Sequence, residues 1–127
     1  MAYTHRIDVS EKDIDQLGHV NNVVYLRYVQ ETAEAHWKNL ASEKMQKETL
    51  WVVLRHEIDY KAPAFAGDRL TGKTWVEPYN GPKMPRIVVI CNAAGKELVK
   101  AKTTWCALDA ESQRPKRIDE ALYNKFL

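Results

Sequence analysis

The sequence has few cysteines, little net charge and no long apolar run, and each absence removes a class of protein. Its 127 residues include only two cysteines, Cys91 and Cys106, without the spacing of a zinc or redox motif. The formal net charge of +2 is too small to predict nucleic-acid binding, and the basic run 114–117 is typical of a solvated tail. No stretch approaches the roughly 20 apolar residues that span a bilayer. The first residues also lack the charged-then-apolar order of a secretory signal.

These absences leave an ordinary globular protein, with 45% hydrophobic and 28% charged residues. The length predicts a single domain over residues 1–127. Both cysteines fall in predicted strands, so we expect reduced core thiols and a cytoplasmic location. We expect no metal, no nucleic-acid partner and no membrane association. The histidines lack a metal-binding spacing such as His-Glu-x-x-His; they are His5, His19, His36 and His56.

The clearest predicted element is an amphipathic helix over 22–40. Apolar and small residues recur at spacings of three and four, and polar residues fill the opposite side. Either Asn21 or Asn22 is a suitable N-cap, because the asparagine side-chain carbonyl accepts an early backbone N–H. The polar residues 41–49 predict a fraying end and a connection. The buried face is predicted to contain Tyr25, Tyr28, Val29, Thr32, Ala33, His36, Trp37 and Leu40.

The rest of the chain has the two-residue period of β-strands. One strand is predicted at 3–9, before the helix, and four follow it at 51–60, 70–77, 86–92 and 97–108. The tail after Pro115 has a weak helical pattern. In the second strand, strict alternation predicts one face with Val52, Leu54, His56, Ile58 and Tyr60. In the last strand, it predicts one face with Val99, Ala101, Thr103, Trp105 and Ala107.

This order of elements predicts an α+β fold with one long helix packed on an antiparallel sheet of about five strands, because the connections have hairpin length. A single helix leaves the other face and the edges of the sheet uncovered, and exposed edges promote pairing. We expect the outer faces to carry Trp51, Val53 and Trp75. The protein is therefore predicted to be a homo-oligomer, a dimer that continues the sheet or a dimer of dimers.

Side chains capable of chemistry gather in residues 13–25, between the first strand and the helix. The N-terminus of a helix offers unpaired N–H groups and the positive end of the helix dipole. Such a site can hold a developing oxyanion, and a nearby carboxylate can act as base or nucleophile. The simpler alternative is that these residues only shape and cap the helix start. The segment contains Asp15, Gly18, His19, Asn21 and Asn22.

Several neighbouring residues have simpler predicted roles. Asp13 is interpreted as an acid that orders the loop. Tyr25, one turn into the helix, is expected to pack in the core, with a place in a pocket as the alternative. His56 alternates with apolar residues and is interpreted as a satisfied core histidine. Glu31 and Glu34 are interpreted as solvated helix charges.

The segment Asp-x-Asp-x-x-Gly-His-Val-Asn-Asn-x-x-Tyr, which follows a strand and opens a long helix, resembles the hotdog-fold acyl-thioester hydrolases. The most similar branch is the 4-hydroxybenzoyl-CoA thioesterase type. The run 58–68 is similar to that family's second strand and turn. The resemblance covers nearly the whole chain. It implies a hotdog fold with a curved sheet, an acyl-CoA thioesterase activity, and no cofactor beyond the coenzyme A of the substrate.

The resemblance also implies roles for individual residues. Asp15 aligns with the catalytic aspartate of the hydroxybenzoyl-CoA branch, and the Asn22 N–H aligns with the donor that polarises the thioester carbonyl. Plant acyl-carrier-protein thioesterases share the Asp-x-x-x-His-Val-Asn-Asn core, which implicates Asp15 and His19. This chain has Leu17 where those enzymes carry an asparagine, and Glu57-Ile58 where they carry Glu-Cys. Their cysteine mechanism is therefore not implied.

We accordingly predict hydrolysis of an acyl-CoA thioester, with Asp15 as base or nucleophile and the helix start at Asn22 as oxyanion site. His19 is expected to bond the substrate or orient Asn22. Lys83 and Arg86 are predicted, from charge and strand-end position, to contact coenzyme A phosphates. The remaining predicted substrate contacts are Gly18, Asn21 and Tyr25. Two alternatives stay open: a thioesterase acting on acyl-carrier protein, and a non-catalytic hotdog protein that binds acyl thioesters.

Overall fold

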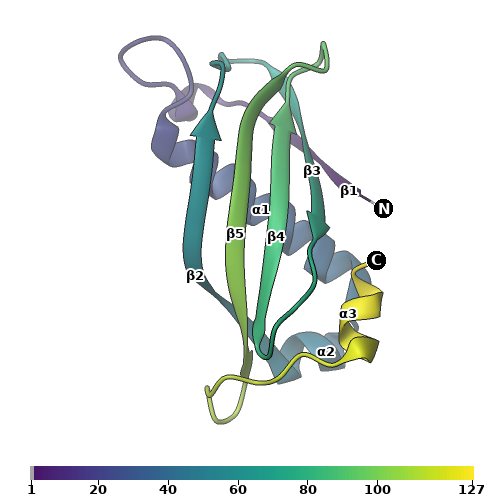
Figure 1. Ribbon diagram of the computed structural model, residues 1–127. Helices are drawn as coiled ribbons and strands as arrows, with labels where there is room; N and C mark the ends of the chain where they lie inside the picture. Colours follow the sequence, from purple (N-terminus) through teal and green to yellow (C-terminus); the bar gives the residue numbers. More distant parts are fainter. Residues whose placement is uncertain (1) are drawn as a thin grey trace.

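The computed structural model describes residues 2–127, and its elements follow the predicted order (Figure 1). The long helix has the predicted bounds 22–40. The strands are β1 (Tyr3–Asp8), β2 (Thr49–Tyr60), β3 (Arg69–Val76), β4 (Lys83–Cys91) and β5 (Glu97–Asp109). The helices are the 3-10 turn η1 (Glu11–Asp13), α1 (Asn22–Leu40), α2 (Glu43–Glu48) and α3 (Glu120–Lys125).

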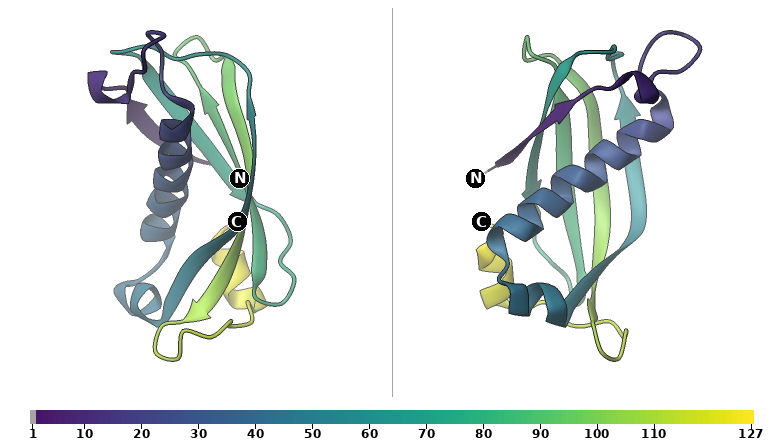
Figure 2. Two further views of the ribbon diagram at one scale, coloured as in Figure 1. Left: turned by 90° about the vertical axis from the view of Figure 1, so that its left-hand side faces the viewer. Right: turned by 180° about the vertical axis from the view of Figure 1, so that it is seen from behind.

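The five strands form one antiparallel sheet in the order β1-β3-β4-β5-β2, and α1 runs along one face of it (Figure 2). Within residues 2–127, no helix covers the opposite face (Figure 2). The predicted α+β architecture is therefore confirmed. The strands at the two edges are β1 and β2, and β2 is 12 residues long.

Helix α1 begins where an asparagine cap ends the preceding loop. The Asn21 side chain accepts the Val23 N–H at 3.0 Å, which satisfies one of the free donors of the first turn. Further along, Thr32 lies directly over Gly72 of β3, so closely that a β-carbon there would collide with the threonine side chain. The glycine thus lets the helix approach the sheet. The residues that α1 buries confirm most of the predicted face: Tyr25, Tyr28, Val29, Thr32, Ala33 and His36.

Strand β2 departs from the strict alternation predicted for it. Its pairing with β5 shifts register between Val53 and Arg55, which leaves Leu54 as the extra residue of a bulge. Trp51 and Val53 therefore face α1, with Trp51 packed against Trp37 at a ring distance of 5.6 Å. Their predicted position on the outer face was wrong. Beyond the bulge the prediction holds, since Ile58 packs against the core below α1.

The core divides into two clusters along α1. One lies under the first half of the helix and includes Val20, Tyr25 and Leu70. The other lies near the helix end, where Ile118 and Phe126 of the C-terminal segment pack against Trp37 and Trp51. Both cysteines are buried and unpaired, as predicted.

The segment after α1 differs from the prediction. Residues 43–48 form the short helix α2, capped by Ser42, whose hydroxyl accepts the Met45 N–H at 3.2 Å. Met45 is the only apolar residue of α2, so hydrophobic periodicity did not reveal this helix. Within residues 2–127, every helix is too short or too polar to cross a membrane.

Candidate active site

The loop before α1 is ordered by Asp13, whose side chain is buried. This carboxylate accepts hydrogen bonds from the Tyr28 hydroxyl at 2.7 Å, from Arg27 Nη2 at 2.7 Å and from the Ser10 N–H at 3.2 Å. Burial alone would raise the pKa of Asp13, but these hydrogen bonds hold it below its usual value. The same residue's carbonyl accepts the Asn21 N–H at 2.9 Å. The prediction of a loop-ordering acid is confirmed.

A tight turn then brings Asp15 and His19 to the same side of the loop. The Asp15 N–H donates to the His19 carbonyl at 2.9 Å, and Gly18 occupies the left-handed region with φ of 84°. Asp15 Oδ1 accepts the Leu17 N–H at 2.8 Å and lies 3.9 Å from His19 Nδ1. Oδ2 has no hydrogen-bond donor within residues 2–127. Asp15 and Asn21 help to line a depression that opens to solvent.

The start of α1 lies beside this turn. The Asn21 side chain takes the Val23 N–H, whereas the Asn22 N–H meets no protein acceptor in the part of the chain that the structure describes. The Asn22 carbonyl accepts the Tyr60 hydroxyl at 3.2 Å, which fastens the helix start to the end of β2. A backbone donor at a helix N-terminus is therefore available to an incoming acceptor.

Tyr25 supports this site from within the core. Only 2% of it is exposed, and its hydroxyl oxygen accepts the Ala64 N–H at 3.0 Å. Burial raises the pKa of the Tyr25 hydroxyl. The Val20 N–H donates to the Ala64 carbonyl at 2.8 Å, so the 60–68 connection is tied to both the loop and the helix. Tyr25 therefore packs in the core, as expected, and does not line the depression.

The two cations predicted to contact coenzyme A lie at the other end of the molecule. Strand β4 starts at Lys83, at the end of the sheet opposite the helix start (Figure 1). Lys83 is exposed, but in one chain it is far from Asp15, so a role at that site requires the lysine of a second chain. Arg86 is only 4% exposed and faces α1. The prediction of Arg86 as a surface contact for phosphate was wrong, because its guanidinium is buried between the helix and the sheet.

The remaining candidates have structural partners or lie in solvent. His56 Nδ1 lies 2.8 Å from the Thr103 hydroxyl, and burial lowers the pKa of His56, as expected for a satisfied core histidine. Glu31 is exposed and pairs with Arg27 at 3.2 Å. Glu34 is also exposed. Sequence reasoning missed the Arg27 and Tyr28 contacts with Asp13, although their positions 14 and 15 residues downstream are consecutive on the helix.

The sequence and the fold of this chain are similar to those of known proteins. A family model of the acyl-ACP thioesterase N-terminal domain matches residues 1–126. The chain is a member of the hotdog-fold thioesterase family. One relative, "Putative acyl-CoA thioesterase YneP" of Bacillus subtilis (strain 168), is 33% identical over 112 residues, which cover 86% of this chain and 81% of that protein.

Two further thioesterases are similar over nearly their whole length. The long-chain acyl-CoA thioesterase FadM of Escherichia coli (strain K12) is 28% identical over 127 residues, covering 95% of this chain and 94% of that protein. A crystal structure of a thioesterase from Thermus thermophilus, complexed with coenzyme A and Zn, superposes with a TM-score of 0.84 and 25% identity. That alignment covers 97% of this chain and 90% of the other. The predicted hotdog fold is thus confirmed.

Proposed function

We propose that this protein hydrolyses an acyl-CoA thioester to a free acid and coenzyme A at the loop–helix junction around Asp15. The observation that carries the proposal is the pairing of a carboxylate, Asp15, with an unengaged backbone donor, the Asn22 N–H, beside a solvent-open depression. The names of YneP and FadM both contain the words acyl-CoA thioesterase, and this supports the same substrate class.

The geometry suits the chemistry of thioester cleavage. The thioester carbonyl oxygen accepts the Asn22 N–H, and the helix dipole stabilises the negative charge that develops there. Asp15 then acts in one of two ways. Its carboxylate attacks the carbonyl carbon to form a mixed anhydride and expel the thiolate, after which water cleaves the anhydride. In the other route, Asp15 removes a proton from water as the water attacks. The Leu17 N–H holds one carboxylate oxygen and leaves the other for either role.

His19 and the glycine turn complete the proposed site. His19 lies near enough to Asp15 to shift into a direct hydrogen bond when substrate binds, and it also contacts Phe65 edge-on at 6.5 Å. Gly18 allows this tight turn, because any residue with a side chain would be strained at its positive φ. Asn21 holds the helix start, and the Asn22 donor depends on that position.

The test is an assay of free thiol release with short, long and aromatic acyl-CoA substrates. Wild-type protein is compared with Asp15→Asn and with Asp59→Asn, which removes the same charge from an exposed β2 residue without a side-chain hydrogen bond in the described chain. We expect turnover of one acyl class by wild type and Asp59→Asn, and loss of turnover in Asp15→Asn. An Asp15→Asn protein with wild-type rates contradicts the assigned site.

A second candidate substrate is acyl-carrier protein, because the matching family model is that of acyl-ACP thioesterases. Rates on the same acyl group carried by coenzyme A and by acyl-carrier protein distinguish the two. A folded protein that turns over neither carrier but binds acyl-CoA corresponds to the third possibility, a non-catalytic binding protein.

We further propose that the protein works as a homodimer or a dimer of dimers. Strand β2 leaves one side of its backbone unpaired at the sheet edge, and it exposes apolar side chains such as Leu50, Val52 and Leu54. Association through this edge would bring a second chain beside the first. Light scattering coupled to size-exclusion chromatography measures the mass, and a monomer of 14.7 kDa would contradict the proposal.

A further inference from the structure

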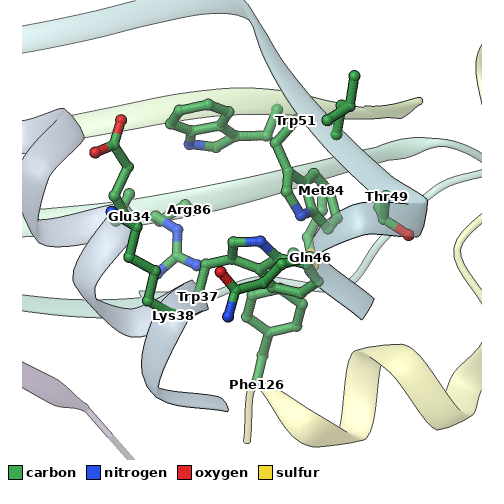
Figure 3. Close-up of a pocket in the computed structure, with 12 residues that line it drawn as sticks. Glu34, Trp37, Lys38, Gln46, Thr49, Trp51, Met84, Arg86 and Phe126 are labelled. Carbon is green, nitrogen blue, oxygen red and sulfur yellow. The ribbon is translucent and has the colours of Figure 1, made fainter. Parts of the chain in front are cut away.

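A cavity of about 270 Å³ lies between the second half of α1 and the sheet. Figure 3 shows how distant parts of the chain meet around it: Trp37 from α1, Trp51 from β2, Arg86 from β4 and Phe126 from the C-terminal segment. The walls are mostly apolar and aromatic. The volume is slightly below the range of pockets that hold drug-sized ligands, so the cavity fits a smaller molecule.

Arg86 places a buried positive charge in this cavity, and the carboxylate that lines the cavity, the exposed Glu34, makes no ion pair with it in the described chain. No Asp or Glu oxygen within residues 2–127 lies within 4.0 Å of its guanidinium. Burial lowers the pKa of Arg86 to about 10, so the side chain is still charged at neutral pH. A buried unpaired cation is costly, and proteins rarely retain one without a partner.

The hydrogen bonds of Arg86 leave one edge of its guanidinium open. Nη1 donates to His36 Nδ1 at 3.0 Å and to the Thr74 hydroxyl at 2.8 Å. Arginine has no acceptor atom, so His36 must accept at Nδ1 and carry its proton on Nε2. The N–H groups of Nε and Nη2 have no protein acceptor in the described chain. These two nitrogens form the fork that binds a carboxylate through two parallel hydrogen bonds.

Two indole donors in the same cavity also lack partners. Trp51 Nε1 and Trp105 Nε1 are buried and are the only side-chain atoms in residues 2–127 found buried without a hydrogen-bond partner. Both tryptophans line the cavity. Buried polar groups are nearly always hydrogen-bonded, and indole nitrogen can only donate. One buried cation with an open edge and two orphan donors in the walls of the same cavity call for an occupant that accepts hydrogen bonds.

We propose that this cavity binds a small carboxylate with an aromatic body. The carboxylate would take the open edge of Arg86 and the indole N–H groups, and the ring would pack among the aromatic walls. Arg86 is the buried cation of the cavity, and one buried cation matches a monoanion. The exposed Lys38 and Glu34 also line the cavity and carry opposite charges, and the apolar walls disfavour a phosphate dianion, which would lose its hydration. The site stands apart from Asp15, because residues 33–38 lie about 16–24 Å along the helix from Asn22 at ~1.5 Å per residue. The proposal does not depend on the thioesterase mechanism.

The test follows the indole N–H signals of the full-length protein by ¹H–¹⁵N NMR while benzoate is added. The chain has four tryptophans, and each Trp→Phe variant identifies one signal. We expect benzoate to move the signals of Trp51 and Trp105 in a saturable way. Trp75, on the opposite face of the sheet, does not line the cavity and serves as the internal reference. Benzamide, which has the same shape without the charge, should bind at least tenfold more weakly.

Variants of Arg86 and of the tryptophans show which groups of the cavity bind benzoate. Arg86→Lys keeps the charge but loses the fork, and should weaken benzoate binding about tenfold or more. Trp51→Phe and Trp105→Phe each remove one N–H donor and should weaken it several-fold, whereas Trp75→Phe should leave it unchanged. If Arg86→Lys does not fold, the benzoate–benzamide difference and the tryptophan variants still decide the question.

Three results would overturn the proposal. Equal binding of benzoate and benzamide would make the cavity a plain apolar pocket. Movement of the Trp75 signal with unchanged Trp51 and Trp105 signals would place the ligand elsewhere. The absence of any saturable shift with benzoate would show that the orphan donors do not form a carboxylate site.

Discussion

The two ends of α1 contain ionisable groups in opposite surroundings. At its start, Asp15 and His19 lie on a partly exposed turn, and the Asp15 side chain is 27% exposed. At the other end, His36 and Arg86 are buried under aromatic rings, with His36 stacked on Tyr3 at 4.9 Å and Arg86 lying 5.5 Å from the Phe126 ring centre. The same helix thus borders a solvent-exposed turn at one end and a largely apolar, partly enclosed cavity at the other.

This contrast separates reactivity from stability. A group that reacts with a thioester needs access to substrate and water, and the turn at the helix start gives Asp15 that access. The groups at the far end shape the interior, so changing them alters the free energy of unfolding. Disturbing one end should therefore leave the other largely unaffected, because residues so far apart with no shared partner act nearly additively.

The largest expected effect is on catalysis. Asp15→Asn should reduce kcat/KM by about 10²–10⁴-fold, the usual contribution of a positioned acid–base group or nucleophile. Because the side chain has the same shape and is partly exposed, the melting temperature should stay within about 2 °C of wild type. Steady-state kinetics and thermal denaturation of the same preparation test both statements. If the melting temperature fell sharply together with the activity, the proposed separation between reactivity at the start of α1 and stability at its end would be contradicted.

At the opposite end, stability should depend on pH through His36. Burial, with a contribution from the Arg86 charge, lowers the pKa of His36 to about 4. The unfolded chain, with an ordinary histidine pKa of about 6.5, takes up the proton first as the pH falls. This contribution is complete above about pH 6.5 and declines toward about pH 4, by at most ~1.4 kcal/mol per pH unit.

Urea unfolding of wild type and His36→Gln between about pH 7 and pH 4.5 isolates the effect, since glutamine accepts a hydrogen bond but does not titrate. His56 shifts in the same direction but is common to both proteins, so it cancels in the difference. We expect the wild-type curve to fall more steeply. Parallel curves would contradict the assigned protonation state of His36.

The next prediction concerns Asp13, the buried acid that orders the loop before α1. Asp13→Ala leaves the Tyr28 hydroxyl and Arg27 without their acceptor, and should reduce the free energy of unfolding by about 2–3 kcal/mol. The lowered pKa of Asp13 adds stability above its unfolded pKa of about 3.9, and this is lost as the pH falls through the lower folded value. Unfolding measured at about pH 7 and pH 3 should show a smaller penalty at the lower pH.

The smallest expected effect concerns the helix cap. Asn21→Ala should destabilise the protein by about 1 kcal/mol, whereas Asn21→Gly should cost only a few tenths. Denaturant unfolding of the pair measures the difference. Because both variants remove the acceptor of the Val23 N–H, a loss near zero in both would mean that this bond at 3.0 Å contributes little.

Sequence patterns predicted the elements of this fold better than the orientation of particular side chains. The bounds of α1 follow from its periodicity and the asparagine at its start, and the structure has the same bounds. The bulge at Leu54 was not predictable, because apolar residues lie on both sides of it and alternation continues through it in the sequence. Arg86 was assigned a phosphate contact from its charge and its place at the end of a predicted strand, and neither property shows that it is buried. Only the aromatic contacts from α1 and the C-terminal segment, which are distant in sequence, reveal its surroundings.

The same limits apply to the candidate site. The segment around Asp15 predicted a loop, the asparagine cap and an acid at Asp13 that orders the loop. It did not predict that Asp13 is buried against Arg27 and Tyr28. It did not predict that Tyr60 and Ala64 hold the helix start from the far side, because those contacts depend on how β2 and its following connection return to α1.

The bulge in β2 also has a consequence for how this architecture tolerates insertions and deletions. One residue sets the phase between two half-strands, with Thr49–Val53 beside the cavity and Arg55–Tyr60 beside the helix start. A chain without Leu54 would need no bulge, because Trp51, Val53, His56 and Ile58 would then alternate without a break and all face α1. If Leu54 were kept and paired without a bulge, Trp51 would instead turn outward while the second half-strand stayed in place. The aromatic wall would then be lost without any change to the loop that carries Asp15.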